Sequence, residues 1–279
     1  ETIFNQYSMG IKTNRDNWCI NFSKNNLQNN MSSTINFYNQ LLERNIENPI
    51  NDDTKLKWSW RLRQQFQKKL KAEFHKNKLI LSIYRPFTKQ WLFWDPLFNE
   101  NRYAFPSIDN SGVKSNLYLC VTGIGCSVPF SCLMMEHIPL QLDNCQCMPL
   151  KIYKNNSNSE NLLFEYEDPM GIDGITDFAL NYFTDFYKQK SIKKENVFFY
   201  IYSILHSKEY RSLFKNNLLK ELPRIPPVSN FEDFKTFSKL GRDLSDLHIN
   251  YEKVDSYPVK IIKNSEFVNE IENTKEFYK

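Results

Sequence analysis

Two stretches near the start of the chain place apolar side chains at helical spacing. In residues 29–46 the apolar positions follow a helical period, and Asn48-Pro49 ends the run. These positions are Met31, Ile35, Tyr38, Leu41 and Leu42. A second helix is predicted to begin near Asp52 or Asp53, either of which can cap it, and to bury a stripe at four-residue intervals: Leu62, Phe66, Leu70 and Phe74. The sequence therefore predicts two N-terminal helices.

After Asn77 the pattern changes to short apolar and aromatic runs separated by Pro, Asn, Asp and Gly, which is typical of strands and turns. These runs are residues 79–84, 91–94, 117–121 and 150–153. The polar stretch 154–161 is the best candidate for a domain boundary. Beyond it, helical periods return in residues 177–187, 195–205, 209–219 and 231–247, while the proline-rich stretch 222–227 predicts an extended crossing between the last two.

These elements predict an α+β fold with N-terminal helices, a central twisted mixed sheet and a helical C-terminal lobe. The expected division is an α+β lobe over residues 1–160 and a mainly helical lobe over residues 161–279. A content of 41% hydrophobic, 15% aromatic and 24% charged residues is that of a folded protein rather than a disordered chain. The 279 residues are enough to bury a substantial core.

The charge and the chain ends narrow the class of protein further. A net charge of +4 is mild, so any polyanionic partner must be recognised by where the cations lie. The sequence has neither an apolar run long enough to span a membrane nor a signal peptide, which predicts a cytoplasmic protein. The chain begins at Glu1, without Met and within a patterned segment, so we expect it to be part of a longer protein.

No motif of a working active site is visible in the sequence. The six cysteines form no C-x-x-C pair, which favours reduced structural thiols over a zinc site or disulfides. Gly123-Ile-Gly125 lacks the third glycine of a dinucleotide site and is interpreted as a turn at a strand end. The four histidines are scattered, and packing explains each better than catalysis. We predict no catalytic residue, no metal site and no cofactor in this chain.

Cationic and amide side chains cluster in three places that could meet a polyanion. The first is the turn-rich segment 7–18, which lies between apolar anchors, and the second is the basic face of the second predicted helix. The third is the region around Arg85, Lys89 and Arg102. A solvated surface explains the basic helix face equally well. Arg15, which is next to Asp16, either contacts a base edge of a nucleic-acid partner or forms an internal ion pair that shapes the segment.

Motifs spread over nearly the whole chain resemble a known family. They begin with Ser8-Met-Gly-Ile-Lys-Thr-Asn-Arg-Asp-Asn-Trp18 and continue with Tyr84-Arg-Pro-Phe-Thr-Lys-Gln-Trp91 and Pro149-Leu-Lys-Ile-Tyr153. Phe199-Tyr-Ile-Tyr-Ser-Ile-Leu-His206, Leu222-Pro-Arg-Ile-Pro226 and Gly241-Arg-Asp-Leu-Ser-Asp-Leu-His248 follow in the same order. This set is similar to the C-terminal specificity region of Type ISP restriction-modification enzymes and their Type IIG relatives. Asn14 departs from the family, where Gly is common.

The resemblance implies a bacterial parent enzyme with an endonuclease, an ATPase and an N6-adenine methyltransferase. S-adenosylmethionine, Mg²⁺ and ATP are expected in those modules only. This chain is then expected to recognise double-stranded DNA at a short asymmetric site, to contact the methyltransferase module and to have no catalytic activity. Alternatives are a helical module that docks other domains of the parent, and a stand-alone enzyme of unfamiliar type. The residues expected to contact DNA are Lys12, Thr13, Asn14, Arg15, Arg61, Lys68, Lys69, Lys71, Arg85, Lys89, Arg102 and Asn116.

Overall fold

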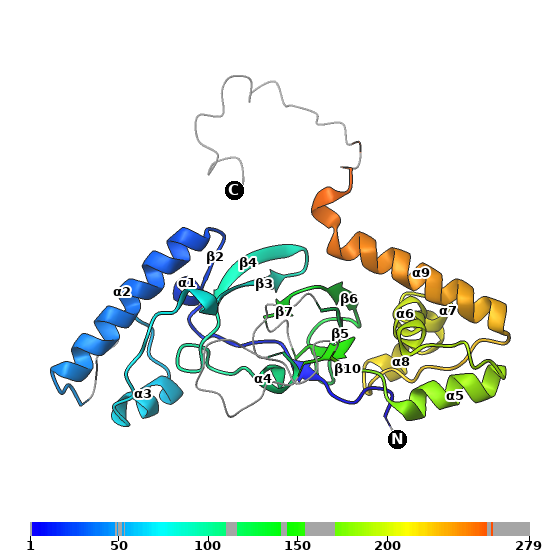
Figure 1. Ribbon diagram of the computed structural model, residues 1–279, viewed down its shortest axis with the longest axis horizontal. Helices are drawn as coiled ribbons and strands as arrows, with labels where there is room; N and C mark the ends of the chain where they lie inside the picture. The colour runs from blue at the N-terminus through cyan, green and yellow to red at the C-terminus, as the bar shows by residue number, and fades with distance from the viewer. Residues whose placement is uncertain are drawn as a thin grey trace.

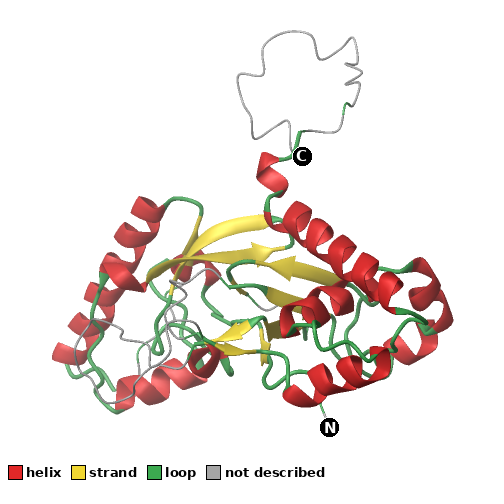
Figure 2. Ribbon diagram, turned by 45° about the vertical axis from the view of Figure 1, so that its right-hand side comes forward, coloured by secondary structure: helices red, strands yellow, loops and turns green. Residues whose placement is uncertain are grey.

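The computed structural model describes residues 2–47, 49, 52, 54–109, 116–140, 144–153, 171–255 and 258. Strands occupy the middle of the molecule, with α2 and α3 at one end and α5 to α9 at the other (Figures 1 and 2). The α+β class and the helical C-terminal region are thus confirmed. The predicted boundary at residue 160 lies outside the described residues.

The first predicted helix is confirmed as α2 (Lys24–Glu43), which begins earlier than the apolar pattern indicated. Its N-cap is Ser23, whose side chain accepts a hydrogen bond from the Asn26 backbone N–H at 3.3 Å. The short helix α1 (Asp16–Cys19) precedes it. The buried stripe of α2 consists of Leu27, Met31, Thr34, Ile35 and Tyr38. The helical period therefore gave the buried face, whereas the cap defined the start.

The second predicted helix was too long, because only α3 (Trp60–Gln67) is helical in that region. The helix ends where Lys69 adopts a left-handed backbone with φ of 55°. There the Lys69 N–H donates to the Phe66 carbonyl at 2.8 Å and the Leu70 N–H to the Gln65 carbonyl at 3.3 Å, the Schellman pattern of a helix end. Lys68, Lys69 and Lys71 are exposed at and beyond this end, so they do not form one helical face.

The strands divide between two four-stranded sheets instead of forming one central sheet. The first, with the order β1-β8-β5-β6, is antiparallel, and the second, β2-β4-β3-β7, is mixed because β3 and β7 are parallel. A further pair joins β9 to β10. The bounds are β1 (Ser8–Met9), β2 (Ile20–Asn21), β3 (Leu79–Arg85), β4 (Thr88–Phe93), β5 (Tyr118–Val121), β6 (Cys132–Met135), β7 (Ile138–Pro139), β8 (Gln146–Pro149), β9 (Lys151–Ile152) and β10 (Ile172–Asp173). The short elements α4 (Phe105–Ile108) and η1 (Lys76–Lys78) adjoin these strands.

Strand β5 lies between two hydrophobic cores because its side chains alternate between the two faces of the sheet. Tyr118 and Cys120 belong to the core that includes the buried face of α2. Leu119 and Val121 belong to the core formed with the C-terminal helices. All four residues of β5 are buried. The first sheet therefore connects the helical lobe to the rest of the molecule.

The helical lobe consists of α5 (Asp177–Tyr187), α6 (Lys194–Ile204), α7 (Lys208–Leu213), α8 (Lys215–Leu218) and α9 (Phe231–Ile249), followed by η2 (Tyr251–Lys253). The predicted single helix 209–219 is divided into α7 and α8. The extended crossing 222–227 is confirmed, and three tyrosine hydroxyls hold it and the residue that follows. Tyr210, Tyr200 and Tyr187 donate to the carbonyls of Arg224, Pro226 and Val228 at 2.7, 2.7 and 2.9 Å.

A histidine cluster at the contact of α6, α9 and β6 should make stability depend on pH. Tyr202 hydrogen-bonds His248 and accepts from the Met134 N–H at 3.0 Å, and its ring centroid lies 4.7 Å from that of His206. Burial, with the Arg211 and His248 charges, lowers the pKa of His206 from 6.5 to about 4. The folded state therefore favours neutral His206, so the associated stability is present above pH 6.5 and is lost as pH falls toward 4.

We expect the melting temperature to fall between pH 7 and pH 4.5, and to fall less steeply in a His206→Gln variant. Carboxylates titrate in both proteins, so the difference between the two melting curves isolates the histidine. Equal pH dependence in the two proteins would contradict this assignment.

Candidate nucleic-acid interface

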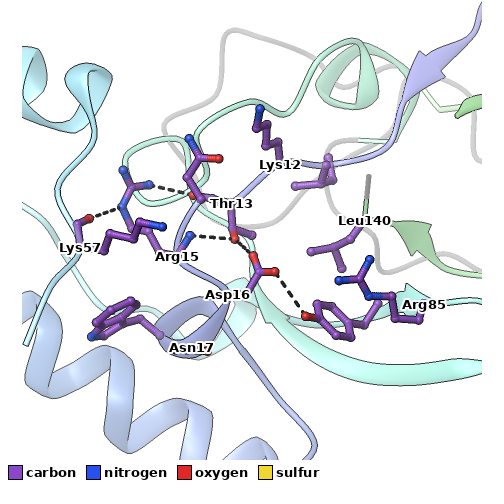
Figure 3. Close-up of a pocket in the computed structure, with 12 residues that line it drawn as sticks. Lys12, Thr13, Arg15, Asp16, Asn17, Lys57, Arg85 and Leu140 are labelled. Atoms are coloured by element: carbon purple, nitrogen blue, oxygen red, sulfur yellow. Dashed lines mark hydrogen bonds between the residues drawn. The ribbon is translucent and has the colours of Figure 1, made fainter. Parts of the chain in front are cut away.

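Segment 11–18 lines a polar pocket of about 380 Å³ (Figure 3). The Ile11 N–H donates to the Pro139 carbonyl at 2.9 Å, which fixes one end of the segment beside β7. The remaining walls come from Lys57, from Leu140 and from Tyr84 and Arg85 at the end of β3. Polar side chains that line the pocket are Lys12, Thr13, Asn14, Arg15, Asp16, Asn17, Lys57, Tyr84 and Arg85. Five of the predicted DNA-contacting residues are thus brought together.

Arg15 is buried behind the pocket wall, with 1% of its surface exposed. Its Nε donates to the Lys57 carbonyl at 3.1 Å, and its Nη1 to the carbonyls of Thr13 and Phe98 at 3.0 and 2.7 Å. Its Nη2 donates to Ser59 Oγ at 2.5 Å and to Glu100 Oε2 at 3.1 Å. In Figure 3 the guanidinium points toward the Lys57 backbone.

These contacts correct both expectations for Arg15. Its acidic partner is Glu100, not Asp16, and the ion pair has one partner fully buried and the other 19% exposed. A guanidinium that already donates to four oxygens of the protein interior and to Ser59 has no donor left for a base edge. Arg15 therefore connects segment 11–18 to the loops around residues 57–59 and 98–100, and shapes the pocket.

Hydrogen bonds within segment 11–18 fix its shape as well. The buried Thr13 hydroxyl bonds to the Asp16 carboxylate and accepts from the Arg15 N–H at 3.1 Å. The Tyr84 hydroxyl donates to the other oxygen of Asp16 at 3.4 Å. Asn14 has a φ of 57°, a left-handed backbone that asparagine tolerates better than most residues. Asn14 can therefore adopt a conformation that otherwise favours glycine, and Thr13 helps to fix the segment, while its contact with DNA stays a prediction.

Three predicted cations gather around loop 100–102 beside the pocket. The backbones of Lys12 and Asn101 pair through two hydrogen bonds of 2.8 Å, and the Lys12 side chain is exposed. The Arg61 Nη1 donates to the Glu100 carbonyl at 2.8 Å. The Arg102 guanidinium lies 4.9 Å from the Trp94 ring centroid, and burial lowers the pKa of Arg102. Lys12 and Arg61 are thus exposed, whereas Arg102 is half-buried.

Two other predicted contacts have structural roles away from the pocket. Lys89 forms ion pairs with Glu136 at 2.8 Å and Glu252 at 3.4 Å, which attaches β4 to the end of the helical lobe. Asn116 is buried, and its amide donates to the Lys151 carbonyl at 2.8 Å and accepts from the Lys151 N–H at 3.2 Å. The polar groups of both residues thus have protein partners in this structure, and their contact with DNA stays a prediction.

The sequence-based choice of site residues missed Asn17 and Lys57. Lys57 was assigned to the second helix, but it lies in an extended segment before α3. There exposed Lys57 alternates with the buried side chains of Leu56 and Trp58. This alternation was the available signal. Within the described part of the chain, Lys12, Lys57 and Arg85 form no ion pair, so they are free to meet phosphates.

The described residues contain no group of three or more His, Cys, Asp or Glu side chains arranged to hold a metal ion. None of the described helices combines the length and apolar character that a membrane crossing requires. No disulfide joins the described cysteines, and burial raises the pKa of Cys19 to about 12. A thiol with such a pKa is not a nucleophile at neutral pH.

Exposed cations line a polar pocket, an arrangement that fits an anionic partner. The chain belongs to the Type ISP C-terminal specificity domain family, whose model matches residues 2–278. The resemblance found in the sequence is thereby confirmed, and with it the place of this chain among the DNA-specificity domains of bacterial restriction-modification enzymes. None of the curated proteins is similar enough to count as a relative.

Three solved structures resemble this chain and were determined with DNA. The DrdV–DNA complex, seen by cryo-electron microscopy, has a TM-score of 0.79 and 31% identity and covers 93% of this chain. LlaBIII, an ATP-dependent Type ISP restriction-modification enzyme bound to DNA, has a TM-score of 0.77 and 29% identity and covers 93% of this chain. A nuclease-deletion mutant of the Type ISP enzyme LlaGI, in complex with a DNA substrate mimic, has a TM-score of 0.72 and 29% identity and covers 92% of this chain. The present chain spans 25%, 16% and 23% of the respective chains.

Proposed function

We propose that this chain binds duplex DNA in a sequence-specific manner and positions an N6-adenine methyltransferase and an endonuclease of its parent enzyme on a short asymmetric site. The observation that carries the proposal is the polar pocket, whose lining combines the cations Lys12, Lys57 and Arg85 with the amide side chains of Asn14 and Asn17. The DNA in the structures of the related enzymes supports the same function.

The pocket supplies the two kinds of contact that specific binding needs. Lysine and arginine neutralise phosphates and fix the orientation of the protein on the duplex, but they carry no sequence information. Asparagine amides can pair with base edges, with adenine N6 and N7 as their usual partners. The buried Arg15 network fixes the backbone of segment 11–18 to the loops around residues 57–59 and 98–100 before DNA arrives, which lowers the entropy cost of ordering the site. Cations and amides thus have separate roles.

The chemistry of the parent enzyme lies elsewhere in this proposal. S-adenosylmethionine, Mg²⁺ and ATP bind the methyltransferase, nuclease and ATPase modules, and this chain takes no cofactor itself. It contacts the methyltransferase module directly, so that the target adenine is delivered to the catalytic site. A chain that spans a quarter or less of the related enzymes is consistent with one recognition module among several.

Replacing Lys12, Lys57 and Arg85 together with Gln should weaken binding to all duplexes. The slope of log K against log salt should fall by about 0.9 per lost phosphate contact, so by roughly two to three units. Fluorescence anisotropy with cognate and scrambled duplexes over a range of salt measures both slope and affinity. The Lys68/Lys69/Lys71→Gln triple removes the same charge at the end of α3 and provides the comparison: a smaller fall in slope than for the pocket triple assigns the phosphate contacts to the pocket, and an equal fall shows only the loss of net charge.

One observation favours the docking alternative for the helical lobe. An apolar cavity of about 460 Å³ opens between the first residues of the chain, α5 and the 222–225 segment. Phe178 and Tyr182 line it and are each 44% exposed, and Arg224 is the one cation of its lining. Such a surface fits a protein partner better than DNA. If neither charge triple changes the salt slope, the result favours the docking alternative over DNA binding.

A further inference from the structure

We infer that Trp60 is a stacking contact of the DNA interface, lying against a base or sugar face at the edge of the polar pocket. This inference rests on the proposed function and adds to it an aromatic contact that neither charge nor base-edge hydrogen bonding provides. The ligand is a nucleic acid whose ring faces become accessible where the duplex is distorted.

Trp60 is exposed in a way that its role in folding does not explain. It is the first residue of α3 and is 74% exposed, more than any other aromatic side chain in the described part of the chain. The other four tryptophans all belong to the core or pack against it: Trp18, Trp58, Trp91 and Trp94. A large indole left in water gains its hydrophobic free energy only when a partner covers it.

The surroundings of Trp60 favour a nucleic acid as that partner. Residues 54–72 contain no Asp or Glu, and the neighbouring side chains of Lys57 and Arg61 are exposed. The nearby Glu100 carboxylate is already paired with Arg15 and Ser59. An apolar ring beside exposed cations that form no ion pair within the described residues matches a polyanion that also has flat apolar faces, which is the chemistry of single-stranded or distorted nucleic acid.

The backbone beneath Trp60 is held firmly against the pocket. Ser59 caps α3 by accepting from the Leu62 N–H at 3.2 Å, and its hydroxyl also donates to Glu100 at 2.5 Å. Arg15 holds Ser59 Oγ at 2.5 Å and the Lys57 carbonyl at 3.1 Å. The start of α3 is therefore fixed to segment 11–18, which holds the Trp60 backbone three residues from Lys57 of the pocket lining.

The test compares Trp60→Ala with wild type in the 279-residue chain. We expect about tenfold weaker binding to cognate and scrambled duplexes, because stacking is tolerant of sequence. The salt slope and the melting temperature should stay unchanged, whereas Arg61→Gln should reduce the slope. The control is Phe22→Ala, which removes a ring that is 72% exposed at the start of α2. It should bind DNA as wild type does.

A second readout follows the indole directly. The emission of wild type minus that of Trp60→Phe reports on Trp60, and duplex DNA should quench it. Unchanged affinity of Trp60→Ala, or a difference emission insensitive to DNA, overturns the inference while wild-type binding leaves the proposed function intact. If Trp60→Ala lost binding to polyglutamate but kept its binding to DNA, Trp60 would belong to a site for an acidic protein partner, and the inference would be overturned as well. Absence of selective binding by wild type would reject the proposed function itself.

Discussion

Replacing Arg15 with alanine should lower the free energy of unfolding by about 3 kcal/mol or more, the usual cost of breaking a buried ion pair. The change leaves the Glu100 carboxylate and the carbonyls of Lys57 and Phe98 without their shared donor. For a chain of this size the melting temperature should fall by roughly 6 to 12 °C. Because segment 11–18 loses its anchor, affinity for cognate and scrambled duplexes should decrease together.

The control for this prediction is Arg85→Ala in the same pocket. Arg85 is exposed and its guanidinium lies 4.8 Å from the Tyr84 ring centroid, so its loss should weaken DNA binding with little effect on melting. Calorimetry beside anisotropy on both duplexes separates the two arginines. If Arg15→Ala melted as wild type does and lost affinity for the cognate site alone, Arg15 would be a base contact and the buried network would have no structural role.

The second large effect is expected at Gly241, where α9 crosses α6. A Cβ atom there would lie 1.9 Å from the Phe199 carbonyl oxygen, 2.8 Å from its carbon and 3.2 Å from the Ser203 nitrogen. These are backbone atoms, so the two helices would have to separate, and we expect Gly241→Ala to destabilise the protein by about 3 kcal/mol. Helix propensity alone predicts the opposite sign, a gain of about 1 kcal/mol.

Ser245→Ala, one turn further along α9, is the matched control. Ser245 is fully buried and its hydroxyl has no hydrogen-bond partner among the described residues, so its removal should be neutral or stabilising. Urea unfolding of the two variants measures both changes. A Gly241→Ala protein as stable as wild type would show that α6 and α9 do not approach this closely. Since the contact lies in the helical lobe, folded variants should keep selective DNA binding.

The sequence was most informative where local signals decide structure. The bounds of α5 match the predicted segment because Thr176 caps it by accepting from the Ala179 N–H at 3.1 Å. The start of α9 likewise follows its cap, Asn230. The strand runs gave β3 and β5 for a similar reason, since both carry consecutive buried apolar residues. The motifs spread along the chain gave the family, and the family model matches residues 2–278.

Local signals failed where distant segments compete for the same residue. The apolar spacing of Leu70 and Phe74 continued the α3 stripe in the sequence, but the chain turns at Lys69. Phe74 then stacks on Phe93 of β4, with ring centroids 5.7 Å apart. A periodic pattern does not show which neighbour covers an apolar side chain. The same limit applies to the strands, whose assignment to two sheets depends on pairings between segments far apart in the chain.

The sequence by itself thus determined the helical and strand segments, the family and the concentration of cations in segment 11–18 and around Arg85. Only the tertiary structure decided which of those cations are exposed beside the pocket. Lys12 and Arg85 are exposed beside a pocket, while Arg15, Lys89 and Asn116 are held by protein partners. The physical reason is that a polar side chain is free only if no distant segment supplies it with a partner. For Arg15 those partners come from residues 57–59 and 98–100, which the fold alone brings to it.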